Sequence, residues 1–154
     1  MIKLLIAIAA LVIPGTAFAA DSVALSSLVF VEKTTADANG KPMVTLQEPK
    51  IVTPGDRLIF ILNYQNRGAT PANNFVVTNP LPNAVAYQGT PDPSAEVSVD
   101  GGKNWGRLAA LKIADGAGQW RSARPEDVTH VRWTMKQAIP AGAQGKFSFR
   151  GIVR

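Results

Sequence analysis

The sequence contains no cysteine and only one histidine, His130, among its 154 residues. Without cysteine the chain has no disulfide, no thiolate metal site and no cysteine nucleophile. A single histidine excludes a metal site built from several histidines. The chain also lacks the Gly-x-Ser-x-Gly turn that presents a serine nucleophile in hydrolases. The sequence therefore argues against thiol-dependent catalysis, metal sites built from histidines and serine-triad catalysis.

Paired carboxylates are also scarce. Most of the 11 acidic residues stand in predicted turns, and Glu126-Asp127 is the only adjacent pair. A glycosidase needs two carboxylates that face one cleft, and a calcium loop needs several oxygen ligands at ordered spacing. We therefore predict that the protein is not an enzyme and has no catalytic residue, no metal ligand and no cofactor.

Long apolar runs are confined to the first residues. Lys3 precedes an apolar run from Leu4 to Ile13, Pro14-Gly15 interrupts the run, and Ala17-Phe-Ala19 has the small-x-small cleavage pattern. This order predicts a signal peptide over residues 1–19 that is removed on export. No later run is long enough to span a bilayer. We expect the mature chain, residues 20–154, in the periplasm or at the cell surface, with no membrane span.

Basic residues are in modest excess over acidic residues, and they are not clustered in the sequence. Without Lys3, 15 basic residues outnumber 11 acidic residues, which gives a net charge of +4. The basic residues are scattered singly along the chain, whereas a phosphate backbone is followed by a basic stripe or patch. We therefore predict no nucleic-acid partner, and weak attraction to anionic cell-surface polymers stays open.

Helical periodicity is also absent, and turn residues are frequent. Eleven prolines and 13 glycines interrupt the chain about every six residues, a spacing typical of short strands and turns. We predict one all-β domain, an antiparallel β-sandwich, with strands near residues 23–33, 43–46, 57–66, 73–79, 85–87, 96–99, 107–113, 128–135 and 146–153. The alternation of apolar residues predicts a core of Phe60, Leu62, Val77, Trp133, Phe147 and Phe149.

The stretch from Val52 to Pro82 has the strongest strand signal. Pro54-Gly55-Asp56 forms a turn before alternating apolar residues, Asn66-Arg67-Gly68 ends this strand, and Pro80 and Pro82 bound the next. We predict that the two strands form an antiparallel pair.

This stretch resembles a known family, the DUF11 conserved repeat domain of bacterial surface proteins. The motifs that carry the resemblance are Thr53-Pro-Gly-Asp-Arg-Leu58, Tyr64-Gln-Asn-Arg-Gly68 and Ala72-Asn-Asn-Phe-Val-Val-Thr-Asn-Pro-Leu-Pro82. The likeness is strong over residues 51–87 and looser over 139–150, and Asn79 stands where the family usually has aspartate. The resemblance implies an immunoglobulin-like sandwich with a structural or adhesive role, here in a single copy.

Two kinds of surface are candidates for binding. Short strands at 43–46 and 146–153 are the predicted sheet edges, where another envelope protein or a second copy could add a strand. Trp120, Arg121 and Arg124, in a polar segment, are the candidate ligand contacts. The main hypothesis is therefore a non-catalytic exported interaction module, and the alternative is a carbohydrate-binding module.

Two further motifs have structural interpretations. Ser98-Val-Asp100-Gly-Gly102-Lys-Asn-Trp105 is similar to an Asp box, a motif that braces a β-hairpin, with Asn104 in place of the usual threonine. His130 falls opposite Val131 and Trp133 in the strand alternation, so we predict an exposed histidine on the outer face.

Overall fold

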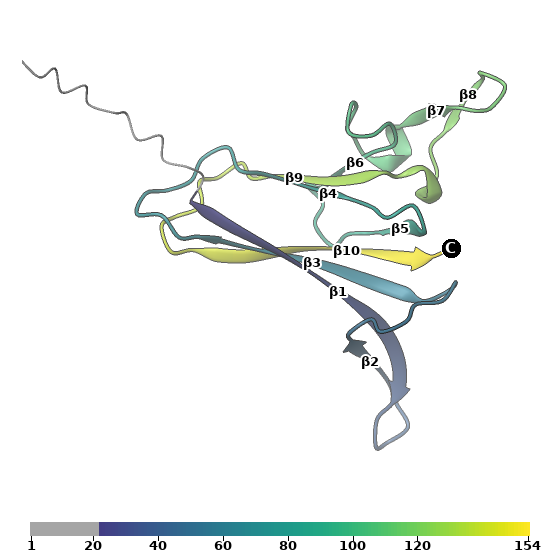
Figure 1. Ribbon diagram of the computed structural model, residues 1–154, viewed down its shortest axis with the longest axis horizontal. Coiled ribbons are helices and arrows are strands. Elements are labelled where there is room, and N and C mark those ends of the chain that lie inside the picture. Colours follow the sequence, from purple (N-terminus) through teal and green to yellow (C-terminus); the bar gives the residue numbers. More distant parts are fainter. Residues whose placement is uncertain (1–21) are drawn as a thin grey trace, which may run out of the picture.

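The computed structural model describes residues 22–154, so the predicted signal peptide at 1–19 lies outside the described residues. The described residues form two facing antiparallel sheets and a separate small hairpin (Figure 1). This confirms the prediction of an all-β sandwich. The strands are β1 Val23–Ala36, β2 Pro42–Gln47, β3 Arg57–Asn66, β4 Val76–Pro80, β5 Val85–Gly89, β6 Glu96–Ser98, β7 Lys112–Ala114, β8 Trp120–Ser122, β9 His130–Thr134 and β10 Gln144–Val153.

The larger sheet has five strands in the order β2-β1-β3-β10-β5. The smaller sheet has the order β4-β9-β6, and β7 and β8 pair only with each other. Two short 3₁₀ helices, η1 at Leu108–Ala110 and η2 at Pro125–Asp127, lie in the connections. Within residues 22–154, no helix has the length and apolar character needed to cross a membrane.

The core lies where the smaller sheet covers β3 and β10. All six predicted core residues are buried there. Trp133 of β9 stacks on Phe147 of β10 with 5.1 Å between ring centroids, and Phe149 stacks on Phe60 at 4.5 Å. Aromatic pairs of this kind add about 0.5–1.5 kcal/mol each beyond the area that they bury.

Asn66 joins the end of β3 to two loops. Its side chain is fully buried, and its Nδ2 donates to the carbonyl oxygens of Thr70 at 2.8 Å and Ile139 at 2.9 Å. Its Oδ1 accepts from the Gly68 N–H at 2.9 Å and from the Ser22 hydroxyl at 3.3 Å. Because both halves of the amide are satisfied, the buried polar group stabilises the loops around it.

The predicted pairing of the strands after Val52 is wrong. β3 belongs to the five-stranded sheet and β4 to the three-stranded sheet, so the two strands do not pair. The physical reason is the connection between them: the segment 67–75 is longer than the two to five residues of a hairpin loop, and Asn66 anchors it. The chain therefore crosses from one layer to the other.

The strand predicted near 107–113 forms only in its last part, because η1 occupies Leu108–Ala110 and β7 begins at Lys112. The hairpin that starts at β6 ends with the bridge between Val97 and Gly106. The helix η1 then turns the chain away, and β7 pairs with β8 instead. The segment 119–127, predicted to be irregular, contains β8 and η2.

One end of the larger sheet extends beyond the smaller sheet. In Figure 1 the strands β1 and β2 diverge from the layer of β4 and β9, and their hairpin projects from the sandwich. β1 pairs with β3 over Val23–Glu32 and with β2 over Val31–Ala36. The sandwich therefore has a covered part, around β3 and β10, and an uncovered part, around β1 and β2.

Candidate interaction surface

The predicted contacts Trp120, Arg121 and Arg124 do not form one binding surface. The Trp120 side chain projects from the β7–β8 hairpin and is 72% exposed. The Arg121 guanidinium, in contrast, donates to both oxygens of Asp127 at 2.6 and 2.8 Å, and the Arg124 N–H donates to the same carboxylate at 2.8 Å. Arg121 is thus engaged within the fold, and Trp120 and the exposed Arg124 side chain remain available.

The Arg121–Asp127 pair also shifts both titrations. The hydrogen bonds from Arg121 hold the pKa of the Asp127 carboxyl below its usual range, with help from the Arg124 N–H. The same carboxylate raises the pKa of Arg121. Both groups remain charged at neutral pH, so neither is a proton donor or acceptor for chemistry.

The Asp-box motif forms the predicted hairpin brace. The Asp100 Oδ1 accepts from the Asn104 N–H at 2.9 Å and from the Lys103 N–H at 3.1 Å, while its Oδ2 accepts from the Asn104 side chain at 2.7 Å. The buried Ser98 hydroxyl donates to Asp100 at 2.7 Å. These bonds, led by that from the Asn104 N–H, hold the pKa of Asp100 far below its usual range. Asn104 therefore contributes both its N–H and its side chain to the brace.

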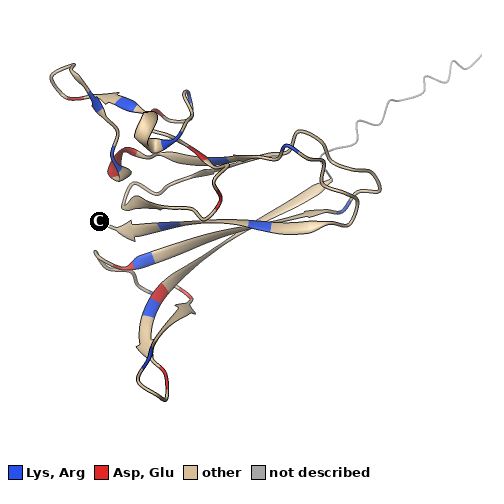
Figure 2. Cartoon of the chain, turned by 180° about the vertical axis from the view of Figure 1, so that it is seen from behind, with Lys and Arg blue, Asp and Glu red and all other residues tan. Residues whose placement is uncertain are grey.

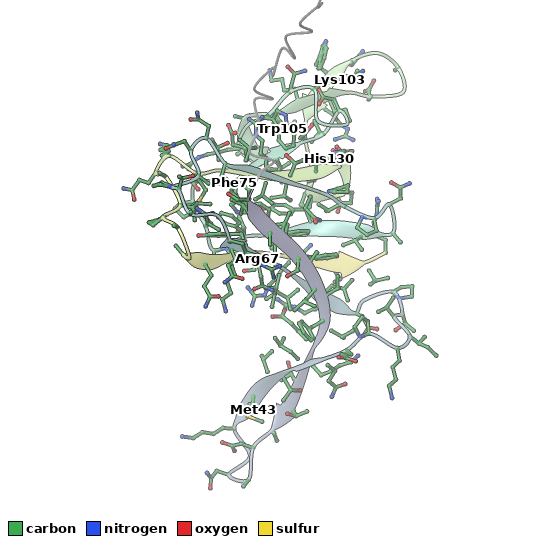
Figure 3. All side chains as sticks on the ribbon, turned by 60° about the vertical axis from the view of Figure 1, so that its left-hand side comes forward. Met43, Arg67, Phe75, Lys103, Trp105 and His130 are labelled. Carbon is green, nitrogen blue, oxygen red and sulfur yellow. The ribbon has the colours of Figure 1, made fainter. Side chains whose placement is uncertain are left out.

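The brace folds Trp105 onto the outer face of the smaller sheet. The Arg132 guanidinium lies 4.3 Å from the Trp105 ring centroid and donates to Glu96 at 2.6 Å. The His130 ring meets Trp105 edge-on at 6.3 Å and is half-buried, so the prediction of an exposed histidine is wrong (Figure 3). These contacts, together with the bond from the Trp105 Nε1–H to the Gly102 carbonyl at 2.9 Å, hold the partly buried Trp105 in the brace.

Two surface grooves on the larger sheet differ in their polar lining. An open groove of about 640 Å³ crosses β1, β3 and β10, and its polar lining consists of amides, hydroxyls and the basic residues Arg67 and Lys146. A smaller groove includes Glu32, but two atoms of Arg150 hold that carboxylate at 2.8–2.9 Å. Within residues 22–154, no three acidic or histidine side chains gather to hold a metal ion. Neither of these two grooves, as residues 22–154 line them, brings together two unengaged carboxylates of the kind that glycoside hydrolysis needs.

Exposed apolar side chains gather at the uncovered part of the larger sheet. Of the nine large apolar residues that are exposed among residues 22–154, seven lie between residues 25 and 52. We call these seven the β1–β2 surface: Leu25, Leu28, Met43, Val44, Leu46, Ile51 and Val52. Figure 3 shows Met43 on the projecting hairpin, at the end of the molecule away from Trp105 and His130. Leu28, Val44 and Leu46 lie on one face of β1 and β2, and Leu25 and Met43 lie on the other, so the exposed apolar residues occur on both faces of this part of the sheet.

The first half of β1 also has an unpaired backbone edge. β2 occupies the outer edge of β1 only from Val31 onward. Within residues 22–154, no strand pairs with that edge over Val23–Phe30, which we call the free edge of β1. An unpaired edge of this length offers a row of N–H and C=O groups to an incoming strand.

The free edge of β1 lacks the usual protection against pairing. Natural edge strands carry lysine, proline or a bulge, but residues 22–31 contain no charge and no proline. In Figure 2 the opening part of β1 is tan, and the charged residues on this strand stand toward its junction with β2. The free edge of β1 therefore lacks the charges and prolines that would hinder another strand from pairing with it.

The two predicted edges have different outcomes. β2 is an edge strand, as predicted, but Pro42 begins it and Lys41 and Glu48 flank it. The prediction for residues 146–153 is correct only in part: β10 lies between β3 and β5 and is not an edge strand, but the pairing with β5 covers Arg150–Val153 and leaves 146–149 without a partner strand on that side among residues 22–154. Sequence reasoning missed the free edge of β1, although the charge-free run over 22–31 is a signal that could have found it.

No family model, no curated protein and no solved structure matches this chain. The resemblance to the DUF11 domain therefore stays a prediction from the sequence motifs.

Proposed function

We propose that this chain is a non-catalytic module, exported to the bacterial periplasm or cell surface, that binds another envelope or surface protein. The observation that carries the proposal is the β1–β2 surface, which holds seven of the nine exposed large apolar residues next to an unpaired, uncharged strand edge. The resemblance to a family of bacterial surface domains supports the same role.

The β1–β2 surface has the two components that strand-addition interfaces use. Backbone groups along the free edge of β1 supply affinity through main-chain hydrogen bonds, and the apolar side chains beside them supply pockets and contacts. Burying apolar area contributes about 25 cal/mol per Å². The projecting hairpin places Met43, Val44 and Leu46 where a partner reaches them without a change in the core.

A non-catalytic role is proposed because four of the carboxylates have structural partners. Asp100 and Asp127 brace loops, Glu32 is held by Arg150, and Glu96 is held by Arg132. A hydrolase would need a carboxylate or a histidine that is free to exchange a proton with substrate.

The experiment compares two matched valine substitutions. Val44 is 60% exposed on β2 and Val76 is 49% exposed on β4 of the other sheet, so Val44→Glu and Val76→Glu make the same chemical change on different surfaces. The wild-type mature chain and both variants are immobilised, exposed to envelope extract and washed. Retained proteins are identified by mass spectrometry.

We expect one defined envelope protein to bind the wild type and Val76→Glu, and to be lost from Val44→Glu. A charge at Val44 would have to be desolvated on binding, which disfavours the complex. Equal retention by all three chains would contradict the proposed surface. Turnover of any substrate by the purified protein would contradict the non-catalytic role.

A carbohydrate-binding module is the second candidate, because the Trp120 ring is 72% exposed on a projecting hairpin. An exposed indole can stack on an apolar face of a sugar. The test is tryptophan fluorescence across a panel of envelope glycans, with Trp120→Ala as the control. Quenching that disappears in Trp120→Ala would support this role, and no response to any glycan would exclude it for the panel.

A further inference from the structure

We infer that the free edge of β1 pairs antiparallel with the same edge of a second copy of this chain, so that two larger sheets join into one. The inference rests on the proposed function and names the occupant of its surface. Strands of two copies would meet over Val23–Phe30, where the described residues provide no partner strand.

The orientation of the backbone on β1 supports pairing at this edge. The Ser22 carbonyl accepts from the Arg67 N–H at 2.8 Å, so Ser22 faces the side of β3. Because neighbouring residues of a strand direct their N–H and C=O groups to opposite sides, Val23, Leu25, Ser27 and Val29 direct theirs to the free edge. These groups are the donors and acceptors that a second strand requires.

The side chains on β1 are complementary to themselves when the strand is read in the opposite direction. On the outer face, the small residues Ala24 and Ser26 come first and the large residues Leu28 and Phe30 follow. An antiparallel second copy therefore sets small residues opposite large ones on this face. Such cross-strand neighbours are the unit that stabilises a sheet.

Only certain registers keep each face of the joined sheet continuous. Opposite residues in an antiparallel pair point to the same face of the sheet. In a symmetric pair of copies, the residue at the centre of the contact must therefore lie opposite the same residue of the other copy. Registers centred on Ser26 or Ser27 meet this condition and stop before Val31, where β2 already pairs. Each forms about six to eight N–H···O bonds between the copies.

The pairing strand brings no charged side chain to the contact. Two positively charged molecules repel, but residues 22–31 contain no charge. The two strands that meet therefore add no like-charge repulsion of their own.

The first experiment substitutes proline at two adjacent serines of the mature chain. Ser27→Pro removes an N–H that faces the free edge, whereas Ser26→Pro removes an N–H that faces β3. We expect the wild type to dimerise with rising concentration in analytical ultracentrifugation. We expect Ser27→Pro to stay monomeric with an unchanged circular dichroism spectrum, and Ser26→Pro to melt at lower temperature.

The second experiment uses the absence of native cysteine. Ser26→Cys and Ser27→Cys place a thiol at the two possible centres of the contact, and Ser122→Cys places one on exposed β8 as a control. Under mild oxidation we expect a disulfide-linked dimer from Ser26→Cys or Ser27→Cys and none from Ser122→Cys. The thiol that crosslinks faster identifies the register.

Two results would overturn the inference: a monomeric wild type at every concentration without a β1 crosslink, or a dimer that persists in Ser27→Pro. A monomeric wild type that still retains an envelope protein, and loses it in Ser27→Pro, would assign the edge to a different protein. That outcome would leave the proposed function intact. Failure of the Val44→Glu comparison would contradict the proposed function instead.

Discussion

Two neighbouring strands of the five-stranded sheet, the central β3 and the adjacent β1, are both apolar but differ in how far their side chains are buried. On β3, Leu58 and Leu62 are 5% and 1% exposed, because the smaller sheet covers them. On β1, Leu25 is 50% exposed although it lies on the same face of the sheet as Leu62, and Leu28 is 47% exposed on the outer face. The comparison teaches that apolar residues in a strand predict a face that favours burial, but not whether the chain itself supplies the cover.

The largest expected effect compares leucines on the two strands. Leu62→Ala removes a side chain from the covered part, and we expect the free energy of unfolding to fall by about 2–5 kcal/mol. Leu28→Ala removes the same atoms from an exposed position, and we expect a change within about 0.5 kcal/mol for the monomer. Urea denaturation at low protein concentration measures both. Similar losses for the two variants would break the comparison.

The next largest effect on the free energy of unfolding is expected at an asparagine side chain that holds loops in place. Asn66→Ala leaves the Thr70 and Ile139 carbonyls and the Gly68 N–H without their partner in a buried position. An unsatisfied buried group costs about 1–3 kcal/mol, so we expect a total loss of about 3 kcal/mol or more.

The control for this prediction is Asn79→Ala. The Asn79 side chain donates to the Pro80 carbonyl next to it, and this bond is exposed. We expect a loss of less than about 1 kcal/mol in the same denaturation assay. An equal loss at the two asparagines would show that Asn66 does not anchor the crossing between sheets.

The covered part of the fold was predictable because its signals are local. Alternating apolar residues identified β3 and β10, and the turn motifs identified their ends. The core residues from Phe60 to Phe149 followed directly from that alternation. The sheet to which each strand belongs was not predictable, because the loop after Asn66 depends on bonds to Thr70 and Ile139 that the sequence does not display.

The candidate site was predictable only in part. β2 was identified as an edge, and Trp120 as an exposed aromatic residue. The bond between Arg121 and Asp127 was missed, because it depends on the short helix η2. The free edge of β1 was missed, because the length over which β2 covers β1 is a tertiary property. A sequence shows which strands can pair but not where the pairing stops.

A smaller effect on stability is expected on acidification, and it involves one carboxylate bonded to β1 and one in the hairpin brace. The hydrogen bond from Lys33 holds the pKa of Asp56 below its usual value of 3.8, and the bonds from Asn104 do the same for Asp100. A carboxylate with a lowered pKa contributes stability that is present above its unfolded pKa and is lost as the pH falls through its folded pKa. We therefore expect the melting temperature to decline only below about pH 4.

Asp100→Asn separates the two contributions to this decline. The variant removes the charge of the hairpin brace, so its melting temperature should depend less steeply on pH below about pH 4. Asp56 lies beside the uncovered part and retains its contribution. A decline that begins near pH 6 would point to a different titrating group and contradict this assignment.

The smallest effect is expected at Trp120. Its side chain is mostly exposed on a hairpin that pairs with no other strand among residues 22–154, so Trp120→Ala should change the free energy of unfolding by less than about 0.5 kcal/mol. Thermal denaturation measures the change. A large loss would show that Trp120 packs against the fold, and it would weaken the carbohydrate-binding alternative.

Amide hydrogen exchange of the mature chain, followed by NMR at low and high concentration, tests the account most directly. At low concentration, we predict rapid exchange at Leu25, Ser27 and Val29 and slow exchange at Ser26 and Leu28, which face β3. At high concentration, we predict that the three rapid amides become protected. Protection of all five at low concentration would mean that the monomer covers this edge itself. Rapid exchange of the first three at every concentration would mean that no second copy covers it.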